Sequence, residues 1–402
     1  MKNTYLLIII LFVFLVSCKS QNKKNNKGED ETTEVNVVQN NNNDEEETKN
    51  YYKKQRQIVE GYVKGGANLN VIIDELGIGE INPLISVIID ESGGFNIDTE
   101  IPEPGIYQLR FPNGSIHLFL RGGKVTIKTD ISNLGDYEII GSQESYHLKE
   151  MYMLLNKTNN KLKAIQKRAE DYKKDKKNNK KLLALVDSMP IYYSAIGKEK
   201  SQNLRKFIDR IDTSMVAILT ALYLDVDENY NYLIELRDKF EKICPHSKFY
   251  KQFDDKISAI IPTGPGVKVA EIALADYNNK EYLLSSLEGN VTLLYFWASF
   301  DNKSRQDNIL INSLFDKYKN KGFKIYSVSL DSEKDEWKDA IVKDKISEWI
   351  NVSDLEGWQS QIANIYRIDG LPYLILINKK GIIIDRGFKS HELESRIKGL
   401  LK

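Results

Sequence analysis

A continuous apolar run from Val291 to Trp297 lies within the last third of the chain. A strand that is apolar on both faces needs cover on both faces, and parallel sheets between helices provide that cover. The segments after it alternate: helical patterns at Asn302–Asn320, Trp337–Lys345 and Glu392–Leu401, and strand patterns at Phe323–Leu330, Tyr373–Asn378 and Ile382–Asp385. This order predicts an α/β domain over residues 263–402.

Composition limits the functions that this chain can have. The 57 Lys and Arg residues balance 57 Asp and Glu residues, so the formal net charge is zero. Nucleic acid is not an expected partner, because a general phosphate binder needs an excess of positive charge. The only cysteines are Cys18 and Cys244, and there are four histidines. We therefore expect no disulfide scaffold, no metal and no cofactor.

The N-terminal segment has the pattern of an export signal. Lys2 is followed by an apolar run from Tyr5 to Val16, which suits a signal peptide and is short for a membrane-spanning helix. The run ends in Leu15-Val16-Ser17-Cys18, which resembles a bacterial lipoprotein box. Residues 1–17 are thus predicted to be removed, and Cys18 to carry the lipid that attaches the chain to a membrane.

The predicted location is the bacterial cell envelope, with the chain lipid-anchored and facing the periplasm. Lys19 follows the cysteine, so the Asp-type inner-membrane retention signal is absent and the outer membrane is favoured over the inner. Residues 19–50 are rich in Asn, Lys and acidic residues and have almost nothing to bury. We interpret residues 18–57 as the lipidated cysteine followed by a disordered tether.

Short runs of β-branched and aromatic residues, separated by Gly, Pro and Asn turn signals, fill residues 58–141. This spacing predicts an all-β, sandwich-like domain. The predicted strands are Ile58–Val63, Asn70–Asp74, Leu84–Asp90, Phe95–Thr99, Ile106–Phe111, Ile116–Leu120 and Lys124–Thr129.

Residues 142–262 have helical patterns and form a predicted helical connector. Apolar residues recur in steps of three and four between Leu148 and Tyr172. A second helix is predicted to start near Pro190 and to end near Ile211, and further helices are predicted at 215–224 and 232–243. The Lys-rich stretch 173–181 could be a basic binding patch, but acidic residues on both sides favour a solvated helix face or turn.

Cys244 stands at the end of a predicted helix, before Pro245. The helix dipole is negative at this end, which raises the pKa of a thiol. A structural role is therefore favoured over a reactive one.

Several motifs follow one another in the C-terminal part: Leu287-x-Gly289-Asn290-Val291, Phe296-Trp297-Ala298-Ser299, Ser329-Leu330-Asp331, Trp337, Ser353-Asp354-Leu355-Glu356-Gly357-Trp358 and Gly370-Leu371-Pro372. They resemble the thioredoxin-like superfamily, in particular the branch of TlpA- and ResA-like (redoxin, AhpC/TSA-like) envelope thiol-disulfide oxidoreductases. The resemblance implies a thioredoxin-like fold in which Pro372 is the cis-proline beside the active-site turn.

The β-rich region has motifs of its own: Asp90-x-x-Gly93-Gly94-Phe95, Glu103-Pro104-Gly105-Ile106-Tyr107, Leu120-x-Gly122-Gly123-x-Val125 and Ile140-Gly141-Ser142. They resemble the β-rich domain that precedes redoxin domains in many envelope lipoproteins.

The sequence differs from the thiol-disulfide oxidoreductase family at the Cys-x-x-Cys motif, whose two thiols carry out the family's reaction. The family carries Cys-x-x-Cys after Phe-Trp-Ala-Ser-Trp, whereas this chain reads Phe300-Asp301-Asn302-Lys303-Ser304. A carboxylate and a hydroxyl cannot perform thiol–disulfide exchange, and no sulfenic acid can form here. Tyr295 also replaces the buried acid that thioredoxins often carry.

Several interpretations of this altered turn stay open. Asp301 could be a helix N-cap, which the preference of Asp for that position favours, or a catalytic or ligand residue. Asp301, Asp331 and Asp354 could bind a hard cation, but they lack a ligand spacing. Trp337, Trp349 and Trp358 are interpreted as packing residues.

We expect no catalytic residue at Asp301 or Ser304, and a peptide groove formed by Trp297, Phe300, Leu371 and Pro372. The favoured function is a non-redox peptide- or protein-binding module, with an envelope protein or peptide as its partner. The alternatives are a residual oxidoreductase that works through Cys244 or a partner's cysteines, and a purely structural lipoprotein.

Overall fold

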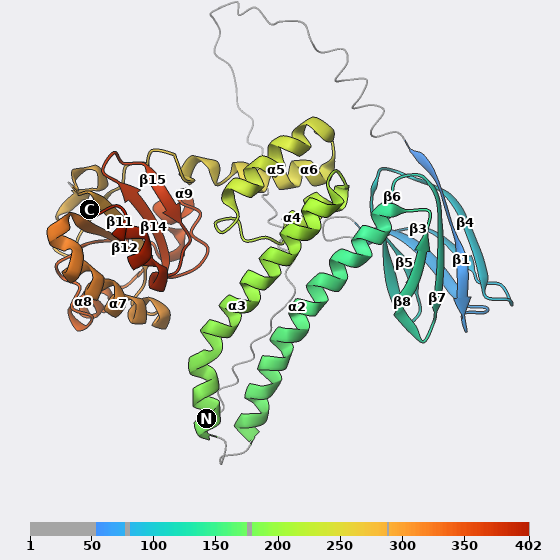
Figure 1. The fold of residues 1–402 in the computed structure, drawn as a ribbon, viewed down its shortest axis with the longest axis horizontal. Coiled ribbons are helices and arrows are strands. Elements are labelled where there is room, and N and C mark those ends of the chain that lie inside the picture. The colour runs from blue at the N-terminus through green and yellow to red at the C-terminus, as the bar shows by residue number, and fades with distance from the viewer. Residues whose placement is uncertain (1–53, 77–80, 175–178, 288, 402) are drawn as a thin grey trace, which may run out of the picture. The chain divides into compact units, whose positions relative to one another are not determined.

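The computed structural model describes residues 54–76, 81–174, 179–287 and 289–401, with only the backbone of Asp187 and Pro190. The predicted signal peptide, the lipidated Cys18 and most of the tether lie outside the described residues. The chain forms two units, one of residues 1–203 with 214–216 and the other of residues 204–213 with 217–402 (Figure 1). No described helix has both the length and the apolar character needed to cross a membrane.

The predicted β-rich region consists of two four-stranded sheets. Their strand orders are β4-β1-β7-β8 and β3-β2-β5-β6, with β1 and β7 parallel. Side chains from both sheets, such as Val59, Ile97 and Leu109, form one buried core. The strands are β1 (Gln55–Lys64), β2 (Asn70–Leu76), β3 (Ile81–Ile88), β4 (Gly94–Ile101), β5 (Gly105–Phe111), β6 (Gly114–Leu120), β7 (Gly123–Asp130) and β8 (Asn133–Ile140).

Strand β8 is absent from the sequence-based prediction. It is an edge strand, and all of its residues are exposed or only half-buried. Gly135 and Asp136 interrupt its apolar pattern. Gly and Asp are depleted in strands, and its pairing with β7 supplies the order that its own sequence does not encode.

Two long helices, α2 (Gln143–Lys174) and α3 (Asn179–Ile211), follow the β-rich domain as a hairpin (Figure 1). Lys161 of α2 forms an ion pair with Glu199 of α3. The predicted start of the second helix at Pro190 is wrong, because α3 begins eleven residues earlier and continues through the proline. A proline removes one helical hydrogen bond, and the turns on both sides of it maintain the helix.

After α3 the chain forms the helices α4 (Met215–Ala221), α5 (Tyr230–Ile243) and α6 (Lys248–Ser258), followed by the 3-10 turn η2 (Ile261–Thr263). The sequence-based prediction lacks α6. Its start is fixed by Ser247, whose hydroxyl accepts a hydrogen bond from the Phe249 backbone N–H. Phe249, Phe253 and Ile257 are buried on one of its faces.

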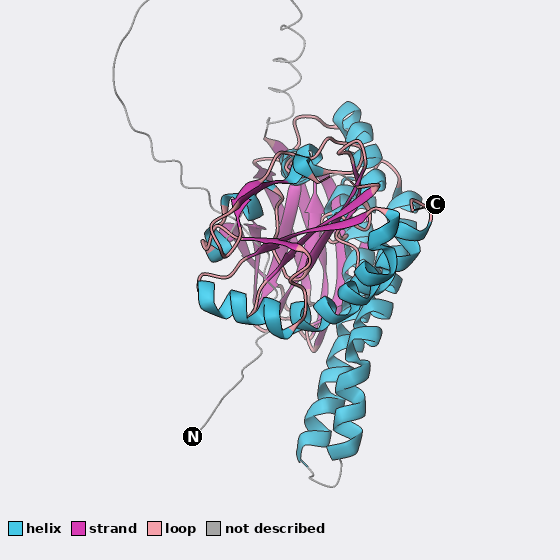
Figure 2. Ribbon diagram, turned by 90° about the vertical axis from the view of Figure 1, so that its left-hand side faces the viewer, coloured by secondary structure: helices cyan, strands magenta, loops and turns pink. Residues whose placement is uncertain are grey.

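The C-terminal domain contains a five-stranded sheet with the order β13-β12-β11-β14-β15. Figure 2, which views the molecule from the side of this domain, shows strands with helices around them. Strands β11, β12 and β13 are parallel, while β14 is antiparallel to β11 and β15. Alternate residues of β11 point to opposite faces of this sheet: Leu293 and Tyr295 into one core, Leu294 and Phe296 into the other. The predicted fully buried strand is therefore confirmed.

The element bounds of this domain are close to the predicted ones for the longer segments. The shorter elements β9, β10, β13 and α9 were not predicted, because three to five residues carry no readable period. The strands are β9 (Ala273–Ala275), β10 (Glu281–Leu283), β11 (Val291–Trp297), β12 (Phe323–Ser329), β13 (Ile350–Val352), β14 (Tyr373–Asn378) and β15 (Ile383–Arg386). The helices are α7 (Asn302–Tyr318), α8 (Lys334–Lys343), α9 (Gln361–Ile365) and α10 (Leu393–Lys398), with the 3-10 turns η3 (Leu284–Ser286), η4 (Lys319–Lys321), η5 (Gly357–Gln359) and η6 (Ser390–Glu392).

Candidate functional site

The carboxyl ends of β11, β12 and β13 meet at one edge of the C-terminal sheet, because these strands are parallel. The loop after β11 carries Asp301, and the loop after β12 carries Asp331. Pro372 reaches the same edge, because Tyr373 at the start of β14 is paired with Phe296 near the end of β11. This edge is the usual ligand site in open α/β sheets.

Asp301 caps helix α7, as the favoured interpretation of the sequence predicts. Its Oδ2 accepts hydrogen bonds from the backbone N–H of Ser304 at 2.7 Å and from the Ser304 hydroxyl at 2.7 Å. The Ser304 side chain is fully buried. Asp301 and Ser304, the positions where the resemblance places cysteines, therefore bind each other and close the first turn of the helix.

Asp331 fixes the turn before the cap. Its carboxylate, almost fully buried, accepts hydrogen bonds from the Ser299 hydroxyl at 2.6 Å, from the Ser299 N–H at 3.0 Å and from the Ser329 hydroxyl at 2.5 Å. Asp354 accepts from the Ser360 hydroxyl at 2.6 Å. The acids of this edge are thus engaged within the protein, and among the described residues no group of three or more His, Cys, Asp or Glu could hold a metal ion.

Arg305, directly after the altered motif, joins α7 to the end of α8. Its Nε and Nη2 donate to the two carboxylate oxygens of Asp344 at 2.5 and 2.6 Å, and Asn308 donates to Asp344 at 2.8 Å. The bond to Asp344 raises the pKa of the Arg305 guanidinium. This bidentate pair fixes the position of α7, so the turn at its start is rigid.

Tyr295 lies beneath the turn, where thioredoxins often carry an acid. It is fully buried, and its hydroxyl donates to the Ser304 carbonyl oxygen at 3.3 Å. Burial raises its pKa well above the usual value for a tyrosine. The residue therefore supports the turn and supplies no proton near neutral pH.

Three of the four predicted groove residues lie at the surface. The Leu371–Pro372 peptide bond is cis, and both side chains are half-buried. Phe300 is 58% exposed. Among the described residues, no backbone hydrogen bond involves Gly370 or Leu371, so this short segment has an unpaired edge.

The assignment of Trp297 to the groove is wrong. Its side chain is fully buried in the core that also contains Trp337 and Ile311, on one face of the sheet. Leu371 packs against the core on the other face. Strand periodicity explains this difference, because Trp297 shares its face with Val291, Leu293 and Tyr295.

Trp358 is an exposed residue that the sequence analysis placed among packing residues. It is 50% exposed in η5, whereas Trp337 and Trp349 are buried as predicted. A Cβ added to the neighbouring Gly357 would lie 3.8 Å from the carbonyl oxygen of Leu330, so this loop adjoins the end of β12. Gly357 has a φ of 56°, a left-handed conformation that favours glycine. The glycine before Trp358 is therefore the sequence feature that indicates a turn at this position.

A buried polar cluster next to Pro372 was also missed. Arg386 of β15 is 3% exposed; its Nε contacts the Tyr373 hydroxyl at 2.9 Å and Asp227 Oδ1 at 2.7 Å. The Tyr373 hydroxyl also donates to Asp227, which precedes α5. Arg386 further donates to the Thr263 hydroxyl at 2.6 Å. Residues separated by more than 140 positions meet here, and no local pattern could reveal it.

Cys244 has the properties that the sequence predicts. It ends α5, is 8% exposed, and its thiol contacts the Phe240 carbonyl oxygen at 3.6 Å. Burial raises its pKa to about 11. A thiol of this kind is almost entirely protonated at neutral pH and is a poor nucleophile.

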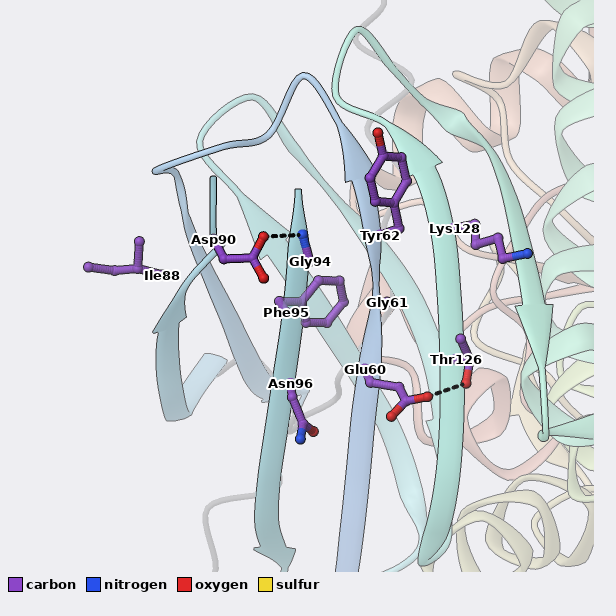
Figure 3. Close-up of a pocket in the computed structure, with 10 residues that line it drawn as sticks. All are labelled: Glu60, Gly61, Tyr62, Ile88, Asp90, Gly94, Phe95, Asn96, Thr126 and Lys128. Carbon is purple, nitrogen blue, oxygen red and sulfur yellow. Dashed lines mark hydrogen bonds between the residues drawn. The ribbon is translucent and has the colours of Figure 1, made fainter. Parts of the chain in front are cut away.

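An open pocket lies on the sheet of β1, β4 and β7 in the β-rich domain (Figure 3). Its carboxylates are engaged: Glu60 accepts from Thr126 at 3.2 Å and from Lys124 at 2.8 Å, and Asp90 accepts from the Gly94 N–H at 2.8 Å. The Phe95 ring lies against Gly61, where an added Cβ would be 2.9 Å from it. These contacts are typical of a solvated sheet face, and they form no catalytic arrangement.

The C-terminal region is similar to known proteins. Residues 289–383 match the family model described as Thioredoxin-like. The thiol-disulfide oxidoreductase ResA of Bacillus thuringiensis is 25% identical over 140 residues, which cover 34% of this chain and 76% of that protein.

Two solved structures each match about a third of this chain. A thiol-disulfide oxidoreductase from Bacteroides fragilis is 32% identical, with 33% of this chain and 98% of that one covered and a TM-score of 0.31. The thioredoxin domain of a thiol-disulfide oxidoreductase from Bacteroides vulgatus is 26% identical, with 35% and 99% covered and a TM-score of 0.33. The family match and the sequence relatives together identify the C-terminal part of this chain as a thioredoxin-like domain related to thiol-disulfide oxidoreductases.

Proposed function

We propose that this chain is a lipid-anchored protein of the bacterial cell envelope whose thioredoxin-like domain binds an extended peptide or protein segment without redox chemistry. The observation that carries the proposal is the Asp301–Ser304 contact. A carboxylate and a hydroxyl, 2.7 Å apart, occupy the two positions that hold thiols in the related oxidoreductases. Disulfide exchange needs a thiolate at this turn.

Peptide binding is supported by the surface beside the turn. Phe300 exposes an aromatic ring, and the Gly370–Leu371 segment before Pro372 has an unpaired backbone edge. An extended peptide could add to such an edge through main-chain hydrogen bonds while an apolar side chain packs on Phe300. The rigid network of Asp331 and Arg305 would hold this surface in one shape, which lowers the entropy cost of binding.

The test of the non-redox function uses the chain beside its Cys244→Ser variant and an oxidoreductase with an intact Cys-x-x-Cys pair. Insulin reduction by dithiothreitol and thiol-dependent peroxide consumption are measured. We expect both rates of this protein to equal the uncatalysed background. Turnover that disappears with Cys244→Ser would contradict the proposal and support a residual oxidoreductase, the activity that the names of the relatives favour.

Peptide binding is tested by selection from a random dodecapeptide library on the immobilised Cys244→Ser chain. We expect the selected peptides to bind the Phe300→Asp variant of this chain at least tenfold more weakly than the Cys244→Ser chain itself. The matched control is Val342→Asp, since Val342 is also an exposed apolar residue, at 65%, but lies on helix α8. Equal binding to both variants would place the peptides elsewhere and contradict the groove.

A further inference from the structure

The half of the α2–α3 hairpin near its turn carries a strong excess of positive charge. Among the described residues of 157–181 there are nine basic side chains and two acidic ones, Glu170 and Asp171. Only two of the nine have an ion-pair partner among the described residues, Lys161 with Glu199 and Lys174 with Asp171. We name the nine residues the basic arm: Lys157, Lys161, Lys163, Lys167, Arg168, Lys173, Lys174, Lys180 and Lys181.

Apolar side chains are exposed beside the basic arm. Leu183 is 58% exposed, Val186 47% and Ile191 71%, all in the first half of α3. A two-helix hairpin has only one seam in which to bury such residues. A surface that combines unpaired positive charge with exposed aliphatic groups fits an acidic partner that also contains apolar residues.

The chain itself contains a segment with that chemistry. Between Glu29 and Glu47 there are eight Asp and Glu residues and no Lys or Arg, and Val35, Val37 and Val38 lie in its middle. The zero net charge of the whole chain thus conceals two oppositely charged regions. We propose that the acidic segment 29–47 binds the basic arm of the same molecule.

The connection allows this contact. Gln55 lies at the β6–β7 turn, because a Cβ added to Gly122 would be 2.6 Å from its Oε1. Helix α2 starts near the same turn, where the Ser145 hydroxyl accepts from the Phe119 N–H at 3.0 Å. The basic residues of α2 lie about 18 to 45 Å along the helix from Ser145, at about 1.5 Å per residue. Residues 29–54 span up to about 85 Å when extended, which is sufficient.

The energetics favour the acidic segment over a second copy of the hairpin. Two copies would bring equal positive excesses together, which costs free energy. Each exposed ion pair contributes little to the free energy of binding, but the short connection supplies an effective concentration in the millimolar range. Binding is therefore weak per contact, independent of protein concentration, and lost at high salt.

The experiment is limited trypsin digestion of the full chain in neutral detergent, with cleavage in 157–181 measured by mass spectrometry relative to the exposed Lys379–Lys380 turn. The test variant replaces the eight acids of 29–47 by Gln or Asn. At 50 mM NaCl, we expect the basic arm of the unmodified chain to be cleaved at least fivefold more slowly than that of the test variant. At 500 mM NaCl, we expect the two chains to be cleaved at the same rate. The matched control replaces Asn40 to Asn43 by Ser and should behave as the unmodified chain.

A second measurement does not depend on protease access. A labelled peptide of residues 29–47 is titrated into the neutralised variant and followed by fluorescence anisotropy. We expect binding that weakens at least fivefold when Lys157, Lys163 and Lys167 become Gln, which preserves helix propensity. Equal cleavage of both chains, or protection that grows with protein concentration, would overturn the proposal. Binding to phosphatidylglycerol vesicles gives a further test. If these vesicles bound the unmodified chain as tightly as the neutralised variant, the basic arm would be unoccupied in the unmodified chain and the proposal would be overturned.

Discussion

Asp301 has a structural role at the start of α7, where it holds the turn through hydrogen bonds that need no thiol. Its carboxylate occupies the N-cap of α7, and the partial positive charge of a helix N-terminus favours an acid there. The same backbone position favours a thiolate in a redox-active relative. A helix N-terminus can thus stabilise either a carboxylate or a thiolate.

Removal of the cap should destabilise the C-terminal domain by about 1 kcal/mol, within a range of about 0.5–2 kcal/mol. We predict this loss for Asp301→Ala, because the Ser304 N–H and its buried hydroxyl lose their acceptor. Asp301→Asn should retain most of the stability, since Asn is an equally good cap. Urea unfolding followed by tryptophan fluorescence reports on this domain, because all four tryptophans lie in it. Equal midpoints for the Ala and Asn variants would refute the cap.

Restoration of the cysteine pair should create redox activity. In the background Cys244→Ser, we predict that Asp301→Cys with Ser304→Cys reduces insulin at least tenfold faster than the parent, because the two side chains already touch and the helix start lowers a thiol pKa. Asp301→Cys alone is the control, since it lacks a resolving thiol. A folded but inactive double variant would show that the surroundings, Tyr295 among them, block the chemistry.

Cys244 should react slowly in the folded protein. Its pKa of about 11 lies two units above the ordinary value of 9.0, so the thiolate fraction at pH 8 is lower by roughly 100-fold than in the unfolded chain. We predict iodoacetamide alkylation at least 100-fold slower in buffer than in 8 M urea. The raised pKa also means that the unfolded state loses its proton first, so the contribution to stability falls as pH rises from 9 to 11. Rapid alkylation of the folded chain would contradict this environment.

At the scale of elements, the Asp227–Tyr373–Arg386 cluster joins the α4–α5 loop to two strands of the sheet. Tyr373 follows the cis Pro372 directly, so the cluster also holds the first residue of β14 next to the candidate groove. Desolvation raises the pKa of Asp227, and the Arg386 charge acts in the opposite direction. The loop between α4 and α5 is thereby part of the support of the site.

Loss of the Asp227 carboxylate should leave Arg386 buried with one polar partner fewer. We predict that Asp227→Ala destabilises the domain by about 2–3 kcal/mol, below the usual cost for a fully buried pair because the Asp227 side chain is 19% exposed. Glu235→Ala, an exposed acid on α5, is the control and should change stability by under about 0.5 kcal/mol. The free energy of unfolding in urea is the measurement. Similar values for both variants would show that the Thr263 hydroxyl and the Tyr366 carbonyl oxygen, which accepts from Arg386 Nη2 at 2.9 Å, suffice as partners of Arg386.

At the scale of the whole molecule, membrane attachment through a lipid on Cys18 can be distinguished by experiment from attachment through a membrane-spanning helix. Cys18, the proposed site of lipid attachment, lies outside the described residues. We predict that the chain expressed in a bacterial host enters the detergent phase of Triton X-114. Cys18→Ser should remain membrane-associated only through its uncleaved signal segment and lose radiolabelled palmitate. Cys244→Ser is the matched control and should keep the label. Label retained in Cys18→Ser would exclude the lipoprotein proposal.

Much of this protein could be predicted from local sequence, since local patterns encode it: the apolar run of β11, the alternation of strands and helices, the cap at Asp301 and the absence of a thiol pair. Tertiary structure decided the rest. Pairing with β7 orders β8, and the helical turns on both sides of Pro190 keep α3 continuous. Residues Ile311 of α7 and Trp337 of α8 pack with Trp297 on one face of β11, and this packing buries it. The contacts of Arg386 with Asp227 and Thr263 join distant residues, and such contacts depend on how the layers pack rather than on any period within one segment.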